Sequence, residues 1–225
     1  MTPGGKVLQH IDATIGRDPA GWTRWPGGWP GDIETALVDA IFSARAVYRT
    51  RSGSGVHHRV ITWRGARRRQ QWTTSALAKE ITSATPDKWS QRFGNAQHSP
   101  SRPASAPGGP TKAATVLEAA LALEAIGVVS AGDITDGNAG DVKRCLRAVP
   151  GIGYATVNYF LMLLGRPGVK PDRMVHRFLS DATGNIRTNG DAERLVEEVA
   201  ERLGVEPSAL DHAIWSYESA KAASP

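Results

Sequence analysis

Val149-Pro-Gly-Ile-Gly-Tyr-Ala-Thr-Val157 is a tight turn that joins two stretches with helical apolar spacing. The first helix is expected over residues 141–148. Pro150 ends it, because proline lacks an amide proton and its ring clashes with the preceding turn. A second, strongly apolar helix is expected over residues 154–164, where a Gly-Arg-Pro-Gly stretch beginning at Gly165 stops it.

The turn between these helices predicts a phosphate-binding site. Gly151 and Gly153 allow a positive φ and a close approach of another backbone. The first amides of the following helix have no partner within it, and with the glycine amides they form a partly positive pocket for a phosphate oxygen. A helix-helix corner without a ligand is the alternative. The residues expected to bind the phosphate are Gly151, Ile152, Gly153, Tyr154 and Thr156.

The rest of the chain carries mainly helical patterns, and this order of elements predicts an all-α protein. Tryptophans at residues 22, 25 and 29 indicate an ordered, non-repeating arm. Residues 60–63 fit either a short extended piece or the start of a helix, and residues 98–110, rich in Pro, Ser and Gly, are expected to form an exposed loop. Further helices are expected near residues 32–42, 75–82, 86–93, 112–126, 191–203 and 207–217.

Charge is unevenly distributed along the chain. Residues 40–79 hold nine Arg and Lys and no acid, whereas residues 181–225 hold nine acids and four bases. Such segregation indicates one face built for a polyanion and another for water. The run Arg67-Arg68-Arg69 is either a solvated face or a DNA contact, and the acid-free window favours DNA contact.

Composition excludes several classes of protein. A chain of 225 residues can bury a substantial core as one compact unit or two small lobes. No apolar run approaches the roughly 18 residues of a membrane span, and the first residues are no signal peptide, so we expect a cytoplasmic protein. Cys145 is the only cysteine. An internal disulfide and a four-cysteine zinc or iron-sulfur site are therefore excluded, and we expect no metal or cofactor.

Three parts of the chain resemble the helix-hairpin-helix DNA glycosylase superfamily. Val-Pro-Gly-Ile-Gly-x-x-Thr at residues 149–156, the apolar helix after it and Asp-x-x-Val-x-Arg at residues 172–177 resemble its hairpin and catalytic segment. Leu-Val-Asp-Ala-Ile-Phe-Ser-Ala-Arg-Ala at residues 37–46 resembles its early helix. Leu-Asp-His-Ala-Ile-Trp-Ser-Tyr at residues 210–217 is similar to its last helix. Together these matches extend from about residue 32 to residue 219.

The resemblance implies a fold of two helical lobes with the active site in the cleft between them. Residues 32–164 would form the central helical lobe, which carries the hairpin. Residues 1–31 would join residues 165–225 in the second lobe. The implied partner is DNA, and we expect a monomer that does not bind a membrane.

The resemblance also assigns chemistry to Asp172, which lies nineteen residues after Gly153. Breaking an N-glycosidic bond leaves positive charge on the sugar, so a nearby carboxylate is favourable and can orient a water. Taken alone, Asp172 also fits the N-cap of a helix. Family members that cut the backbone place a Schiff-base lysine where this chain has Ala155, so the resemblance implies a monofunctional glycosylase. Lys170 is a possible substitute amine.

The substrate stays open at this point. Arg45, where the family often has Gln, and Tyr48 are candidates for the base pocket or for DNA contact. Damaged bases and modified bases of phage DNA, such as modified cytosines, are both compatible, which leaves repair and antiviral defence as possible settings. A non-catalytic helix-hairpin-helix DNA-binding module is the main alternative. A nuclease is disfavoured, because no cluster of acids for two metal ions is visible near the basic segment.

Overall fold

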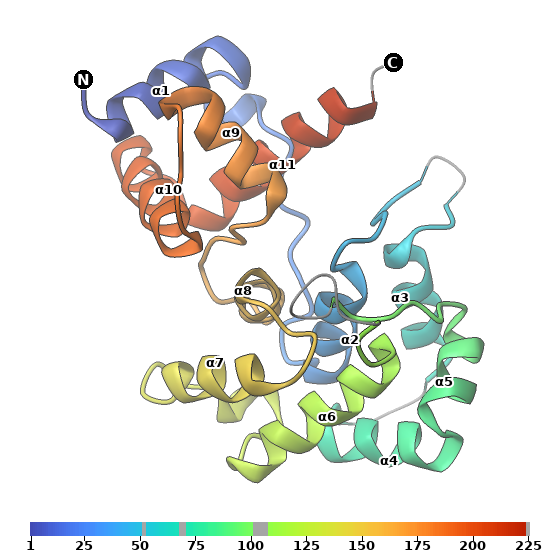
Figure 1. Ribbon diagram of the computed structural model, residues 1–225. Helices are drawn as coiled ribbons and strands as arrows, with labels where there is room; N and C mark the ends of the chain where they lie inside the picture. Colours follow the sequence, from blue (N-terminus) through green and yellow to red (C-terminus); the bar gives the residue numbers. More distant parts are fainter. Residues whose placement is uncertain (51–52, 68–70, 101–107, 224–225) are drawn as a thin grey trace. The chain divides into compact units, whose positions relative to one another are not determined.

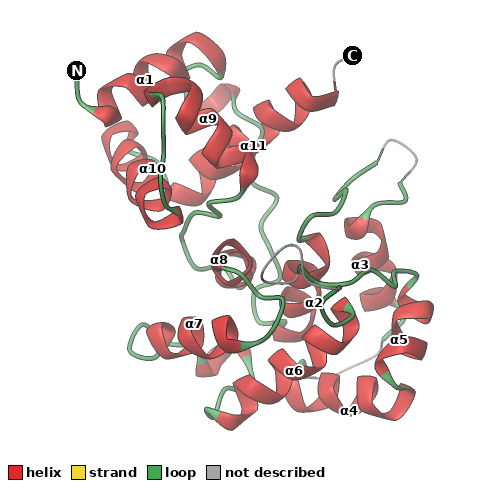
Figure 2. Ribbon diagram, in the orientation of Figure 1, coloured by secondary structure: helices red, strands yellow, loops and turns green. Residues whose placement is uncertain are grey.

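The computed structural model describes residues 1–50, 53–67, 71–100 and 108–223. The protein is all-α, as the sequence predicts, and the described residues form no β-strand (Figure 2). They contain one isolated antiparallel bridge, between His98 and Thr111.

Within this part of the chain there are α-helices and short 3-10 helices (Figure 1). In order they are α1 (Pro3–Thr14), η1 (Pro19–Gly21), α2 (Ile33–Ser43), α3 (Val56–Gly65), α4 (Thr74–Ala84), α5 (Pro86–Phe93), α6 (Lys112–Ala125), η2 (Ala131–Asp133), α7 (Ala139–Ala148), α8 (Tyr154–Leu163), α9 (Arg173–Thr183), α10 (Asn189–Leu203) and α11 (Pro207–Ala223). Residue contacts divide the chain into two compact units. The central unit is Gly28–Gly165, and the terminal unit combines Met1–Gly27 with Arg166–Pro225.

Helix α2 lies at the heart of the central unit. All of its eleven residues are buried, and it packs against α3, α4, α6 and α8. Its polar side chains therefore need partners inside the protein. Asp32 caps its first turn by accepting a hydrogen bond from the Thr35 amide at 2.9 Å. Asp39 accepts hydrogen bonds from the Trp29 indole at 2.8 Å and from the Tyr48 hydroxyl at 2.9 Å.

A buried lysine closes the other end of α2. The Lys112 ammonium donates to the carbonyl oxygens of Phe42 at 2.9 Å and Ala44 at 2.8 Å, and to the Gln97 side-chain oxygen at 3.0 Å. A cation at a helix C-terminus satisfies its last carbonyls and complements its dipole. Burial lowers the pKa of Lys112 to about 8. Lys112 thus joins the start of α6 to the end of α2.

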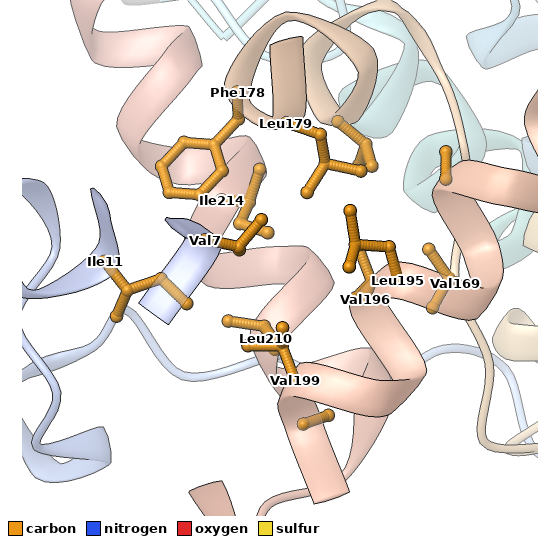
Figure 3. Packing of buried hydrophobic residues seen from close by; sticks show 13 residues of the cluster. Val7, Ile11, Val169, Phe178, Leu179, Leu195, Val196, Val199, Leu210 and Ile214 are labelled. Carbon is orange, nitrogen blue, oxygen red and sulfur yellow. The ribbon is translucent and has the colours of Figure 1, made fainter. Parts of the chain in front are cut away.

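The terminal unit is built around a separate hydrophobic core. Side chains from α1, α9, α10 and α11 point toward one another there (Figure 3). Phe178 of α9 and Ile11 of α1 are fully buried in this core, and so is Val169, which precedes α9. The first helix of this unit is not among those predicted from the sequence. Pro3 begins it and the Thr2 hydroxyl accepts a hydrogen bond from the Gly5 amide at 3.2 Å.

Candidate functional site

The turn between α7 and α8 has the geometry of an anion-binding hairpin. Gly151 has a φ of +92°, which favours glycine. Ile152 is buried and anchors the turn, while Gly153 is the N-cap of α8 and offers no side chain to its first amides. First-turn amides lack partners within a helix, so this end of α8 favours negative charge. Tyr154 and Thr156 are both partly exposed on that first turn.

Residues from a distant part of the central unit support the hairpin. A Cβ atom on Gly151 would lie 2.4 Å from the Ser99 Cβ, so only glycine fits there. The Ser99 hydroxyl lies 2.7 Å from the Thr115 hydroxyl, which donates to the Pro150 carbonyl at 3.4 Å. The Ser99 amide also donates to Pro110 at 2.8 Å.

Ser99 is an exception within residues 98–110, which were expected to form an exposed loop and of which His98 and Gly108 are exposed. Residues 101–107 lie outside the described part, but Ser99 is only 4% exposed. Composition marked the whole segment as unpacked. Ser99 nevertheless packs closely against Gly151 of the hairpin, which has no side chain to block this approach.

Asp172 is the N-cap of α9 in the terminal unit. Its Oδ1 atom accepts hydrogen bonds from the Met174 amide at 2.8 Å and the Val175 amide at 3.4 Å. Capping amides and the start of a helix both favour negative charge at this position. Both amides donate to Oδ1. Among the described residues, none donates a hydrogen bond to Oδ2. Asp172 is half-buried.

A second carboxyl group, missed by sequence reasoning, lies beside Asp172. Asp211 of α11 is 5% exposed, and its Oδ1 accepts a hydrogen bond from the Lys170 amide at 2.8 Å. Burial, opposed by this hydrogen bond and assisted by the charge of Asp172, raises the pKa of Asp211 to about 8. The sequence carries no clear signal for this burial, because an acid between the apolar residues Leu210 and Ile214 also fits the exposed side of a helix.

The candidate base-pocket residues lie beyond the end of α2. Helix α2 ends at Ser43, so Arg45 and Tyr48 lie in the segment that follows it. Arg45 is exposed and has a φ of +52°. Tyr48 instead donates to the buried Asp39. Burial, helped by the charge of Asp39, raises the pKa of Tyr48 far above its usual range and keeps the hydroxyl a donor.

The arginine-rich segment is partly neutralised by acids from other elements. Arg67 is 9% exposed, forms ion pairs with Glu34 of α2 and Glu80 of α4, and lies 3.9 Å from the centre of the Trp63 ring. This burial argues against the expected DNA contact at Arg67. Its acidic partners lie outside the acid-free window of the sequence and are brought to it by the fold. Arg68 and Arg69 lie outside the described residues.

The predicted site residues fall into two groups. The hairpin, Arg45 and Tyr48 belong to the central unit, whereas Asp172 belongs to the terminal unit together with Lys170 and Asp211. In the part of the chain that the structure describes, no helix has the length and apolar character needed to cross a membrane. The same residues contain no group of three or more His, Cys, Asp or Glu side chains placed to hold a metal ion.

Comparison with known proteins identifies a family for this chain. No curated protein and no solved structure matches the chain. A family model described as a domain of unknown function, DUF8548, matches residues 6–219. Since this match covers nearly the whole chain, the protein belongs to the DUF8548 family.

Proposed function

We propose that this protein is a monofunctional DNA glycosylase that flips a damaged or modified base out of DNA and hydrolyses its N-glycosidic bond. The product is an abasic site and the free base. The hairpin of the central unit would bind DNA phosphates, and Asp172 would act on the extruded nucleotide. We further propose that the protein works as a cytoplasmic monomer.

The observation that carries this proposal is the environment of Asp172. Its carboxylate is held by two backbone amides through Oδ1, which leaves Oδ2 for a sugar or a water. As the glycosidic bond breaks, positive charge develops on the sugar, and a preorganised carboxylate stabilises that charge. The same oxygen can accept a proton from the attacking water.

The absence of strand cleavage follows from Ala155, on the first turn of α8. A methyl side chain cannot form the Schiff base that backbone cutting by this route requires. We therefore expect no covalent adduct when the reaction is treated with borohydride. A strong protein-DNA adduct would contradict the monofunctional assignment and would direct attention to Lys170.

Repair and antiviral defence both fit this chemistry. A glycosylase acting on damaged bases and one acting on modified cytosines of phage DNA need the same bond cleavage and differ only in the pocket that reads the base. The second candidate function is a DNA-binding module without catalysis. The hairpin alone favours it, since phosphate binding by helix amides needs no reaction.

Replacing Asp172 with Asn separates the two functions. Asparagine is as good an N-cap as aspartate, so α9 and the fold should be preserved while the negative charge is lost. We expect excision to fall by about 100-fold or more, in line with the loss of one charge-stabilising group. Affinity for an unmodified duplex should stay within about twofold, because phosphate contacts supply most non-specific binding.

The substrate screen uses duplexes and single strands with defined damaged bases, together with genomic DNA that carries natural modifications. Released bases are identified by mass spectrometry. Asp181→Asn, on the exposed part of the same helix, is the matched control and should retain excision. No released base from wild-type protein, together with intact DNA binding, would favour the non-catalytic module. Magnesium-dependent cutting abolished by EDTA would instead indicate a nuclease.

A further inference from the structure

Two carboxyl groups of the terminal unit lie around one short backbone segment. The Lys170 amide donates to Asp211 at 2.8 Å, and the Asp172 amide donates to the Lys170 carbonyl at 2.6 Å. The segment precedes α9, while Asp211 lies near the start of α11, which packs against α9. Asp211 and Asp172 are therefore neighbours in space although they lie 39 positions apart in the sequence.

The two carboxyl groups have contrasting surroundings. Asp172 is half-buried, and its Oδ1 accepts hydrogen bonds from two backbone amides at the start of α9. Asp211 is 5% exposed and, among the described residues, has one amide donor on Oδ1. Burial with a single donor disfavours the charged form of a carboxyl group, and so does a second negative charge nearby. The pair thus has the asymmetry that separates an acid from a base in two-carboxylate sites.

We propose that Asp211 is the general acid of the reaction and protonates the departing base, while Asp172 remains the anion that faces the sugar. This inference rests on the glycosylase function proposed above. It assigns a catalytic role to a residue outside the hairpin and outside the Asp172 cap. It also sets a substrate class, namely neutral bases, which are poor leaving groups without a proton.

The proposed step balances as follows. The bond between C1′ and the base nitrogen breaks, and its electron pair goes to the base as the Asp211 proton is transferred to it. Water adds to C1′ and gives one proton to Asp172. That proton passes to solvent, and Asp211 takes up another from solvent. The net products are the protonated, neutral base and an abasic sugar with a hydroxyl at C1′, which is the division of labour of two-carboxylate glycoside hydrolysis.

The charged groups that face Asp211 are Lys170 and Asp172, and His212 adjoins it on α11. The positive charge of Lys170 favours ionisation of Asp211, yet burial dominates and raises the pKa of Asp211 to about 8. Asp211 therefore carries its proton at neutral pH. Above pH 8 it loses that proton, so excision of a neutral base should decline there.

The test compares wild type with Asp211→Asn on two kinds of duplex. One kind carries 7-methylguanine, whose cationic base leaves without a proton, and the other carries a neutral base such as hypoxanthine or 5-hydroxymethylcytosine. Asparagine keeps the oxygen that accepts from Lys170 but has no acidic proton to transfer. We expect release of the neutral base to fall by about 100-fold or more. Release of 7-methylguanine should change less than about tenfold, and Asp211→Asn should lose the decline in rate above pH 8.

Three other outcomes would contradict the acid role of Asp211, and one of them would also contradict the glycosylase function. Equal losses on both duplexes would mean that Asp211 is structural, and release of 7-methylguanine alone by wild type would mean that no acid is needed. Either result removes the acid role and leaves the glycosylase function standing. No base released by wild type would remove both.

Stability measurements test the proton on Asp211 without any activity. Its folded pKa of about 8 lies above the value of about 3.9 expected for an unfolded chain. Between these values the folded state holds the Asp211 proton and the unfolded state does not, so the contribution of Asp211 to stability is greatest below pH 4 and is lost as pH rises toward 8. Asp211→Asn should remove this loss, and its free energy of unfolding should exceed that of wild type more at pH 8 than at pH 5. An equal difference at both pH values would show that Asp211 is ionised throughout and would overturn the acid role.

Discussion

At the scale of single residues, arginines of one segment have very different surroundings. Arg45 is exposed, whereas Arg67 is 9% exposed and forms ion pairs with Glu34 and Glu80. Arg64 is intermediate, with a 2.7 Å ion pair to the buried Asp32. A count of charges along the sequence treats the three alike. Only the fold, which brings Glu34 of α2 and Glu80 of α4 to Arg67, separates an exposed cation from one that is paired with acids.

Removing the buried arginine should destabilise the protein. Arg67→Met keeps much of the side-chain length but leaves Glu34, which is fully buried, without this cationic partner. We expect the free energy of unfolding to fall by about 3–5 kcal/mol, as when one member of a buried ion pair is removed. Urea denaturation provides the measurement. Arg45→Met is the exposed control and should change stability by less than about 0.5 kcal/mol. Equal effects of the two variants would contradict the structural role of Arg67.

At the scale of elements, the hairpin depends on contacts with residues that lie far from it in the sequence. Gly151 combines a positive φ with the approach of Ser99, and Thr115 of α6 links Ser99 to the Pro150 carbonyl. The end of α7 and the start of α8 are therefore positioned by residues that come earlier in the chain. This support favours a rigid turn, in which the first amides of α8 have a fixed arrangement.

The two glycines of the turn allow a matched comparison. Gly151→Ala places a Cβ at a φ of +92° and against Ser99, so the free energy of unfolding should fall by at least about 1–2 kcal/mol. Gly153 has a φ of −100° and a ψ of 175°, an extended conformation that alanine adopts without backbone strain. Thermal unfolding of both variants measures the difference. A smaller loss of stability for Gly151→Ala than for Gly153→Ala would contradict the role given to Gly151.

Helices with a continuous apolar face could be predicted from the sequence. A helix recognised mainly by the residues at its first turn could not. Helix α6 and the hairpin helices have regular apolar spacing and were expected near their observed places. Helix α1 was missed because Pro3 and two glycines read as a break, although proline suits the first position of a helix. Burial of Asp211 was also beyond the sequence, since it depends on packing of α11 against α9.

At the scale of the whole molecule, the charge asymmetry follows the two units. The central unit contains sixteen basic and ten acidic residues, a net charge of +6, and the terminal unit contains eleven and twelve, a net charge of −1. An anionic polymer is therefore attracted mainly to the central unit, which also carries the hairpin. Exposed bases of that unit contribute to this attraction, whereas those already paired with buried acids contribute little.

The salt dependence of DNA binding tests this division. Arg45→Ala with Arg49→Ala removes two exposed charges from the central unit, and Arg24→Ala with Arg187→Ala removes two from the terminal unit. Each double variant lowers the net charge equally. If both central arginines contact phosphates, the plot of log affinity against log salt for an unmodified duplex should become shallower by about 1.8, or about 0.9 for each contact. The terminal pair should leave the slope unchanged. Fluorescence anisotropy between about 50 and 200 mM salt measures both slopes, and an equal change would mean that net charge, rather than the central unit, governs DNA affinity.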